Sequence, residues 1–492
     1  MIEVYFKNIN INHSNYTMKN RKSVLVICFI SFILSLISCE NSQPEKQPNI
    51  LLICIDDLRP DLKSFGAQHI ISPHIDKLAK QGVSFQKHYV NSPSCGPSRY
   101  TLLTGLYGTP NNNALFLRAK QIAEGKQRNP SMPEWFKTHG YTTVSVGKVS
   151  HHPGGRGGAN WNDSTIIEMP NAWDKYLMPV AEWQHPRGTM HGLAYGEIRE
   201  NASDMDVFQS TKGDDTIYPD GAITDATLNE LKILASDNKK PFFLAVGFIK
   251  PHLPFGAPKQ YYDKYEGVDF SEIEHPEKPQ GRTTWHNSNE FKQYNRWGKN
   301  PNEDADFANE IRRHYAACIT YADAQVGKVL DALKRSGADK NTIVVLWGDH
   351  GWHLGEHAIW GKHSLFEESL HAPLIIRDPR MKERSFKTNA MVETLDIYPT
   401  LCDLADVEIP EFAKGTSLKN VLNKQDTMGH NALAYKAGAS TLRTNTHRLV
   451  LHDDGFVELY DHSTAENETK NIADKHPKIV EKLKQKLNAK WE

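Results

Sequence analysis

A cysteine at the start of a predicted helix has the surroundings of a reaction centre. It lies in the stretch Ser94-Cys95-Gly96-Pro97-Ser98-Arg99. Because proline favours the first turn of a helix, Pro97 predicts a helix start beside Cys95. A helix N-terminus favours anions, and Arg99 adds a positive charge one turn later. These groups predict a nucleophile next to a stabilised oxyanion, and the alternative is a buried, unreactive cysteine.

Charged and histidine residues also follow four apolar runs of strand length. Such runs are typical of buried parallel strands, and α/β proteins bind ligands at the carboxyl ends of these strands. We therefore predict an α/β sheet with a site along one edge. The runs and the residues that follow them are 49–55 with Asp56 and Asp57, 141–146 with Lys148 and His151, 241–248 with His252, and 341–347 with Asp349 and His350.

The adjacent carboxylates of Asp56 and Asp57 repel each other unless a cation neutralises them. Carboxylate oxygens favour hard cations, which predicts Ca²⁺ or Mg²⁺. The other residues admit a second interpretation. Lysine and histidine are common in surface loops, so Lys148 and His151 either converge on an anion or are ordinary loop residues. His252, flanked by prolines, is either a fixed acid–base group or a packing residue.

The stretch from Cys95 to Gly105 resembles the signature of the type I sulfatases, Cys-x-Pro-Ser-Arg-x-x-x-Leu-Thr-Gly, at every defined position. The resemblance implies that a formylglycine-generating or sulfatase-maturating enzyme oxidises Cys95 to formylglycine, whose hydrated aldehyde is the nucleophile. It also implies the alkaline-phosphatase-like sulfatase fold. That α/β fold has a large mixed, mostly parallel sheet flanked by helices, and a small C-terminal antiparallel sheet with a helix.

The same resemblance implies a metal site. The family's metal is usually Ca²⁺, and His350 stands where asparagine is commoner in the family. The implied ligands are Asp56, Asp57, Asp349, His350 and the residue made from Cys95.

Catalytic roles are implied in the same way. The cation and Arg99 hold the sulfate group, and Lys148 stabilises charge throughout. His252 and Lys362 lie near the leaving-group oxygen, where a proton or positive charge is needed. After a covalent step, His151 deprotonates the remaining hydroxyl so that sulfate is released.

Three further stretches, 145–151, 250–255 and 348–357, resemble the iduronate-2-sulfatase branch of the family. The resemblance suggests a uronate-containing sulfated polysaccharide or its oligosaccharides, of glycosaminoglycan or algal ulvan type. Two rivals stay open: a phosphatase or phosphonate hydrolase of the same superfold, and an inactive surface glycan-binding lipoprotein. The predicted sugar contacts are Trp352, His353, His357 and Trp360.

The N-terminus is predicted to direct export. Lys19, Arg21 and Lys22 precede an apolar run over 24–37, which is short for a membrane span. Residues 36–39 resemble the bacterial lipoprotein cleavage box, which implies a signal peptide over 1–39, with Met18 as an alternative start, and a lipid on Cys39. Residues 40–48 read as a polar tether. We expect a lipid-anchored protein in the periplasm or on the surface of a Gram-negative bacterium, and the alternative is an ordinary cleaved signal.

Two further regions follow the tether. We expect a catalytic domain over 49–429 and a small α+β subdomain over 430–492, with alternating segments at 441–451 and 456–460 and a helix from about 472. Residues 153–221 are expected to shape the substrate pocket, and residues 268–305 to form an exposed loop.

Composition limits the partners. The 492 residues carry a net charge of −1, so no bulk attraction to nucleic acid is expected. The six cysteines include no Cys-x-x-Cys pair, which argues against a zinc site or a dense disulfide framework. The expected partners are the sulfated saccharide and the maturating enzyme, with membrane contact only through the lipid.

Overall fold

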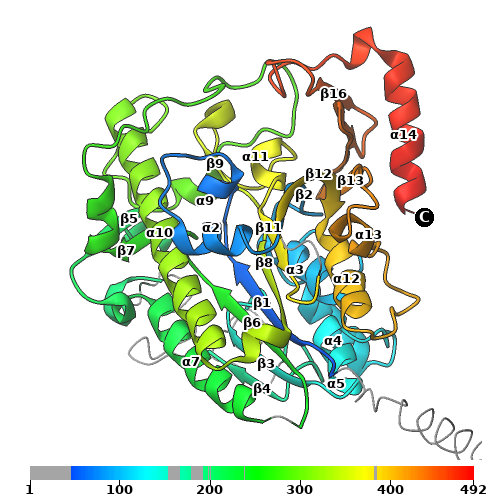
Figure 1. The fold of residues 1–492 in the computed structure, drawn as a ribbon. Helices are drawn as coiled ribbons and strands as arrows, with labels where there is room; N and C mark the ends of the chain where they lie inside the picture. Colours follow the sequence, from blue (N-terminus) through cyan, green and yellow to red (C-terminus); the bar gives the residue numbers. More distant parts are fainter. Residues whose placement is uncertain are drawn as a thin grey trace, which may run out of the picture. The chain divides into compact units, whose positions relative to one another are not determined.

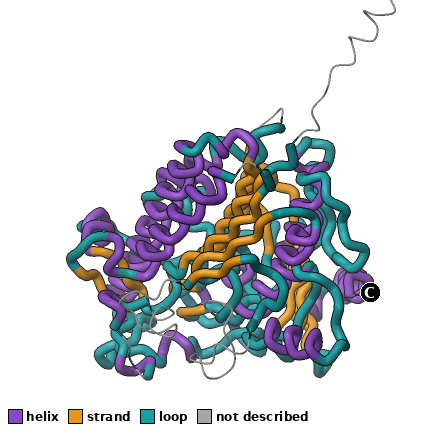
Figure 2. The backbone as a smooth tube through the Cα atoms, turned by 90° about the horizontal axis from the view of Figure 1, so that it is seen from below, coloured by secondary structure: helices purple, strands orange, loops and turns teal. Residues whose placement is uncertain are grey.

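In the computed structural model, one sheet of eight strands lies between two layers of helices, as Figure 2 shows. The structure describes residues 46–152, 167–178, 192–197, 199, 201–237, 239–381 and 385–491. Residues 47–492 form one compact unit. The predicted signal peptide over 1–39, its lipid site Cys39 and part of the 153–221 region lie outside the described residues.

The sheet is mixed but mostly parallel, as predicted. β11 runs antiparallel to both of its neighbours, and the other pairings are parallel. In spatial order the strands are β12 (Phe386–Glu393), β2 (Val83–Tyr89), β11 (Leu374–Arg377), β8 (Thr342–Gly348), β1 (Asn49–Ile55), β6 (Phe242–Phe248), β3 (Thr142–Gly147) and β4 (Lys175–Leu177).

Strand β1 shows why both faces of the sheet are covered (Figure 1). Its alternate residues enter two different apolar cores, since side chains alternate across a strand. The first core is completed by α2 (Pro73–Ala79), α7 (Pro219–Ser236) and α10 (Ala305–Arg335). The second is completed by α3 (Cys95–Thr104), α4 (Ala114–Ala123), α5 (Met132–Thr138), α12 (Ile397–Leu404) and α13 (Lys419–Leu422).

Short elements surround the carboxyl ends of the strands. A two-stranded parallel sheet pairs β5 (Phe208–Thr211) with β7 (Phe255–Pro258), and a hairpin pairs β9 (His353–Leu354) with β10 (Trp360–Gly361). The remaining short helices are α8 (Lys259–Tyr262), α9 (Asn289–Lys292) and α11 (Glu367–Leu370). None of the helices in the described part of the chain has the length and apolar character to span a membrane.

The C-terminal region is a four-stranded antiparallel sheet with one helix, α14 (Pro477–Trp491). The segment 441–451, predicted as one alternating stretch, contains parts of two strands joined by a turn, and the helix starts later than 472 because Pro477 opens its first turn. One face of this sheet packs on α14. The strands are β13 (Ala432–Lys436), β14 (Ala439–Arg443), β15 (His447–His452) and β16 (Val457–Asp461).

Candidate active site

Cys95 is the first residue of α3, so Pro97 lies within the first turn and not at its first position. Gly96 is required next to it, because a Cβ atom there would lie 2.3 Å from Cα of Asn112. The Asn112 Oδ1 atom accepts a hydrogen bond from the Gly96 N–H at 3.1 Å. The N–H groups of the first turn therefore favour negative charge beside position 95.

Lys148 enters the site where β3 and β6 approach closely. Gly147 and Gly247 are paired in register, and a Cβ on Gly147 would lie 2.2 Å from the Gly247 carbonyl oxygen. Gly147 also has a φ of +77°, which favours glycine. The glycine pair thus lets the chain turn so that Lys148 Nζ forms an ion pair with Asp56.

Neighbouring strands bring the predicted metal ligands together. β1 lies beside β8, and the Asp57 N–H donates a hydrogen bond to Asp349 Oδ1 at 2.9 Å. The Cys95 Sγ atom lies 3.2 Å from His350 Nε2. Two overlapping sets each place one candidate ligand atom per residue within 4.8 Å of the others: Asp56, Cys95, Asp349 and His350, and Asp56, Asp57, Cys95 and His252.

Arg99 lies behind these carboxylates. Its Nη2 atom is 3.0 Å from Asp56 Oδ1 and 2.9 Å from Asp349 Oδ2. Nη1 donates to the carbonyl oxygens of Lys148 and Val149, and Nε donates to Asp349. The guanidinium is fully buried and all three nitrogens are engaged. In this structure the side chain of Arg99 positions the aspartates, and its contact with sulfate stays a prediction.

His350 has the tautomer that a metal ligand needs. Its Nδ1 atom lies 2.9 Å from the Gly351 carbonyl oxygen, which can only accept, so the proton is assigned to Nδ1. Burial lowers the pKa of His350 to about 4, so the ring is neutral. The Nε2 lone pair then faces Asp57 Oδ1 at 3.2 Å.

Two of the three carboxylates ionise less readily than usual, because their positive neighbours do not fully compensate for the effect of burial. Burial raises the pKa of Asp57 to about 7 and that of Asp349 to about 7. For Asp56, in contrast, Lys148 and Arg99 overcome the effect of burial and hold the pKa well below its usual value. Asp57 Oδ2 is buried and has no hydrogen-bond partner among the described residues. This donor set therefore fits the divalent cation that the fold implies.

The thiol of Cys95 is disfavoured as a thiolate. Burial and the negative charge of Asp56 raise the pKa of Cys95 well above its usual value. The residue is 1% exposed. Because the thiolate is the reactive form of cysteine, an unmodified Cys95 is a poor nucleophile here.

Lys362 and His252 lie beside Asp57. Lys362 Nζ is 2.8 Å from Asp57 Oδ1 and 3.3 Å from Cys95 Sγ. Asp57 overcomes the effect of burial and holds the pKa of Lys362 well above its usual value. His252 Nε2 lies 4.0 Å from Asp57 Oδ2, and burial, with the charge of Lys362, holds the pKa of His252 well below its usual value. The structure thus supplies a charged amine and a neutral imidazole on one side of Cys95.

His151 lies in the loop after β3. Its Nδ1 atom is buried and has no hydrogen-bond partner among the described residues. Burial and the charge of Lys148 hold the pKa of His151 well below its usual value. The imidazole is therefore neutral and able to accept a proton.

Sequence analysis missed Glu290, which lies on α9 within the segment expected to be only an exposed loop. Its Oε1 atom is 3.5 Å from Lys362 Nζ and 3.9 Å from His252 Nε2. Its Oε2 atom is 3.2 Å from His363 Nε2. No motif distinguishes Glu290 from the other acidic residues of this polar segment, so only the fold could identify it.

Two of the predicted sugar contacts, Trp352 and Trp360, lie in the first apolar core, the one that α10 helps to complete. Their side chains are 0% and 1% exposed. Trp360 Nε1 donates to Asn302 Oδ1 at 2.7 Å. Lys362 Nζ lies 5.3 Å from the centroid of a Trp352 ring, so the ring contacts the lysine through a cation–π interaction. Both rings are packed in the core of this structure, and direct sugar contact by Trp352 and Trp360 stays a prediction.

The two predicted histidine contacts are also held by protein groups. His353 Nε2 bonds with Ser364 Oγ at 2.8 Å, and its ring is fully buried. His357 stacks on Phe366 with ring centroids 4.6 Å apart, and its Nε2 lies 3.6 Å from Glu368. These contacts hold both rings in place, and sugar binding by His353 and His357 stays a prediction.

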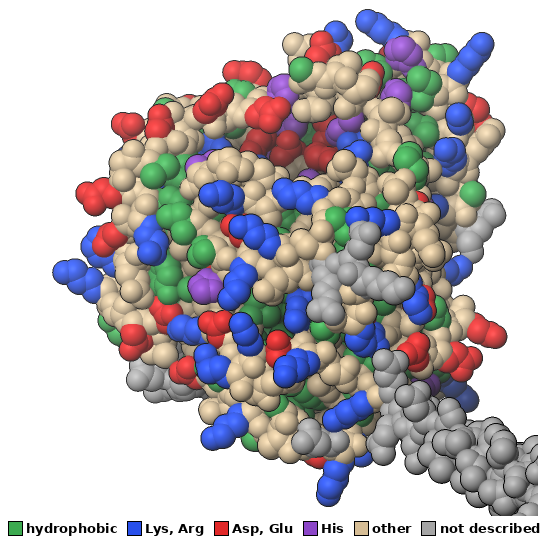
Figure 3. Space-filling view, viewed as in Figure 1, with side chains coloured by type: hydrophobic (Ala, Val, Ile, Leu, Met, Phe, Trp, Pro, Cys, Tyr) green, Lys and Arg blue, Asp and Glu red, His purple; other side chains and the backbone are tan. Residues whose placement is uncertain are grey.

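The structure also contains two hollows, and His357 lines the first of them. Figure 3 shows acidic and histidine side chains gathered in a hollow at the top of the view. A cavity of about 360 Å³ has a lining of this kind, which includes Glu274, His357, Glu367, Glu368, His462 and Glu468.

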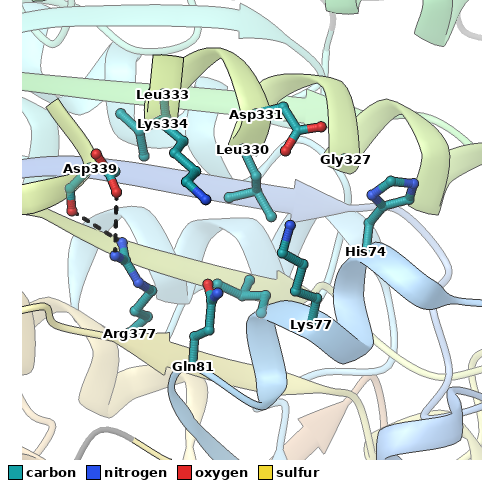
Figure 4. A pocket seen from close by; sticks show the side chains of 11 residues that line it. His74, Lys77, Gln81, Gly327, Leu330, Asp331, Leu333, Lys334, Asp339 and Arg377 are labelled. Carbon is teal, nitrogen blue, oxygen red and sulfur yellow. Dashed lines mark hydrogen bonds and ion pairs between the residues drawn. The ribbon is translucent and has the colours of Figure 1, made fainter. Parts of the chain in front are cut away.

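Figure 4 shows a second hollow, of about 210 Å³, lined by Lys77, Lys334 and Arg377 among others. Asp339, just before β8, pairs there with Arg377, which ends the antiparallel strand β11. This hollow therefore lies at the amino end of β8, opposite the cluster around Cys95.

Comparison with known proteins identifies the family. A sequence model of the sulfatases matches residues 48–407, well over half of the chain. The chain belongs to the sulfatase family. This sulfatase is accordingly a sulfuric ester hydrolase. A second model, described as N-sulphoglucosamine sulphohydrolase, C-terminal, matches residues 355–492.

Curated relatives extend over most of this sulfatase. A sulfatase of Formosa agariphila is 30% identical over 502 aligned residues, which cover 94% of the chain and 92% of the relative. Human iduronate 2-sulfatase is 31% identical over 403 residues, which cover 74% of the chain and 70% of the human protein. The family resemblance inferred from the Cys95 motif is thereby confirmed.

Solved structures confirm the fold. A structure described as a complex with its substrate D-glucosamine-2-N,6-O-disulfate matches with a TM-score of 0.68 and 22% identity, covering 90% of the chain and 97% of that structure. The phosphonate monoester hydrolase of Agrobacterium radiobacter matches with a TM-score of 0.68 and 20% identity. The match covers 90% of the chain and 95% of that structure. At these identities the matches establish shared architecture only.

Proposed function

We propose that this sulfatase removes sulfate from uronate-containing sulfated saccharides of the glycosaminoglycan or ulvan type. We further propose that it uses formylglycine made from Cys95 and a bound divalent cation, Ca²⁺ or Mg²⁺. The observation that carries the proposal is the position of Cys95, at the N-terminus of α3 and beside the under-compensated carboxylates. The similarity to human iduronate 2-sulfatase supports the saccharide class.

The proposed ligands of the cation are Asp56, Asp57, Asp349, His350 and the residue at position 95. When present, the hydrated aldehyde supplies an oxygen nucleophile toward sulfur and the cation offsets the negative charge of the sulfate group. The chain's own residues prepare this arrangement, since Arg99 and Lys148 hold Asp56 and Arg99 also holds Asp349.

Other side chains handle charge and protons. Lys362 places a positive charge 3.3 Å from Cys95 Sγ, where it can stabilise the oxygen that leaves with the alcohol. His252 lies on the same side and is the second candidate for that task. Neutral His151 is the candidate base that accepts a proton when sulfate is released.

The test is sulfate release from a panel of defined sulfated di- and oligosaccharides by protein produced together with a maturating enzyme. The tryptic peptide over 88–99 is examined by mass spectrometry for formylglycine at position 95. We expect sulfate release only from preparations that carry formylglycine, and loss of release in Cys95→Ala. Undiminished release by protein with unmodified Cys95 would refute the nucleophile.

The rivals give other outcomes. Preferred turnover of an aryl phosphate or phosphonate over an aryl sulfate would favour the phosphonate hydrolases, which share the fold. Saccharide binding without any sulfate release by protein with verified formylglycine would favour an inactive glycan-binding protein.

We also propose export with lipid attachment at Cys39, supported by the sequence of residues 19–39. Cys39→Ala is expected to remove lipid labelling and to release the protein from the membrane fraction. Equal labelling of the variant would contradict this attachment.

A further inference from the structure

Glu290 lies on the more exposed side of the cluster around Asp57. The exposed fraction of the side chain rises outward from 0% at Asp57 to 12% at His252, 28% at Glu290 and 41% at His363. The alcohol part of a sulfate ester has to extend toward this more exposed side. Glu290 and His363 therefore border the leaving alcohol and not the sulfate group.

Glu290 is held firmly although α9 is short. The neighbouring Phe291 is 1% exposed and packs on Trp360 with ring centroids 5.9 Å apart. The backbone N–H of Trp360 donates to Ser288 Oγ at 2.9 Å. Because Trp360 lies just before Lys362, these contacts fix Glu290 relative to the lysine.

The carboxylate of Glu290 retains capacity to accept hydrogen bonds. A carboxylate has about four lone-pair positions. The described contacts are a hydrogen bond from His363 at 3.2 Å, a longer ion pair to Lys362 at 3.5 Å, and an approach to 3.9 Å of neutral His252. Lys362 and His363 overcome the effect of burial and hold the pKa of Glu290 well below its usual value, so the group is ionised. Ionised acceptors form the stronger hydrogen bonds.

We propose that Glu290 is a specificity-determining residue that accepts a hydrogen bond from a hydroxyl next to the sulfated carbon of the substrate. This inference rests on the proposed saccharide substrate. A sugar carries hydroxyl groups beside its sulfate ester, whereas a simple aryl sulfate has none. The negative charge also disfavours a second sulfate or a carboxylate at that position.

The test compares Glu290→Gln with the unchanged enzyme on two substrates, the best sulfated saccharide of the panel and 4-nitrophenyl sulfate. Loss of a hydrogen bond to an ionised group predicts a fall of about 10- to 100-fold in kcat/KM for the saccharide. We expect a smaller fall in kcat/KM for 4-nitrophenyl sulfate, because this substrate loses only the effect of Glu290 on Lys362 and His252 and no hydroxyl contact. Exposed Glu303 supplies the matched control, and Glu303→Gln should leave both values unchanged.

A deoxy analogue of the saccharide, which lacks the adjacent hydroxyl, completes the cycle. Glu290→Gln should lower kcat/KM for the analogue no more than it does for 4-nitrophenyl sulfate. An equal fall on the saccharide and on 4-nitrophenyl sulfate, or no fall on either, would overturn the inference while leaving the proposed function intact. Absence of sulfate release from every saccharide by the unchanged enzyme would instead overturn the proposed substrate class, and this inference with it. Thermal unfolding of each variant separates these outcomes from misfolding.

Discussion

Two buried clusters of charge in this sulfatase differ in how their carboxylates are compensated. In the catalytic cluster, burial raises the pKa values of Asp57 and Asp349 to about 7. In the junction cluster, Arg448 overcomes the effect of burial and lowers the pKa of Glu468 to about 2. The catalytic cluster consists of Asp56, Asp57, Arg99, Lys148, Asp349 and Lys362, and the junction cluster of Glu367, Arg443, Arg448, His462 and Glu468.

The difference follows from the partners. Glu468 accepts hydrogen bonds from Arg448 and His462 on one oxygen and from the Glu367 N–H on the other, at 2.6 Å. Its oxygens are already engaged, so a cation is not expected there although the residues lie close enough together. Asp57 keeps one buried oxygen that accepts no hydrogen bond from the part of the chain that the structure describes. Fully compensated carboxylates join the C-terminal sheet to α11, whereas carboxylates whose burial is only partly compensated are suited to binding a cation.

The largest expected effect is on catalysis. Cys95→Ala should lower sulfate release by at least about 10⁴-fold, as loss of a covalent nucleophile does in other hydrolases. Its thermal unfolding temperature should remain close to that of the unchanged protein. Sulfate release and thermal unfolding are measured on the same preparation, and substantial remaining turnover would contradict the assignment.

Asp57→Asn should separate function from stability. Loss of a carboxylate that is proposed to hold the cation is expected to cost several kcal/mol of transition-state stabilisation, about 10³-fold in rate. In chelator-treated protein the unfolding temperature should not fall, because the buried charge is uncompensated without a cation. Added Ca²⁺ should raise the unfolding temperature of the unchanged protein more than that of the variant. A lower unfolding temperature of the chelated variant would show that the charge is stabilising.

Glu468→Gln should give the opposite pattern. Breaking a buried, paired carboxylate is expected to lower the free energy of unfolding by about 3 kcal/mol, because Arg448 is left under-compensated. The kcat/KM of the folded protein should change little. Denaturant unfolding measures the effect, and exposed Glu466→Gln serves as the control. Equal stability of the two variants would remove the contrast between the clusters.

A smaller effect is expected at His430. Asp396, 2.8 Å away, overcomes the effect of burial and raises the pKa of His430 to about 9. The protonated form therefore stabilises the fold fully below the unfolded pKa of about 6.5, and this stabilisation disappears as the pH rises through 9. We expect a loss of about 2 kcal/mol over this window, measured by denaturant unfolding. His430→Asn should lack this dependence, and an identical pH profile would contradict it.

The smallest effect is expected at the amino end of the sheet. Lys77 is exposed in the hollow of Figure 4, where water screens its charge. Lys77→Gln should change the free energy of unfolding by less than about 0.5 kcal/mol and leave sulfate release unchanged. A measurable loss of turnover would show that this hollow communicates with the catalytic cluster.

The amino-acid sequence by itself predicts the local features. Apolar runs identify β1, β3, β6 and β8, and the sulfatase motif identifies Cys95, because strand length, turn chemistry and a linear signature are properties of adjacent residues. The sheet edge that gathers Asp56, Lys148, His252 and Asp349 follows from the same pattern.

Only the tertiary structure decides where side chains point and which distant groups they meet. Arg99 lies behind the aspartates, Trp360 lies in the core, and Glu290 reaches Lys362 across 72 residues of sequence. The turn within 441–451 is likewise settled by pairing between strands. Such contacts depend on the packing of segments that are remote along the chain, and no local pattern encodes them.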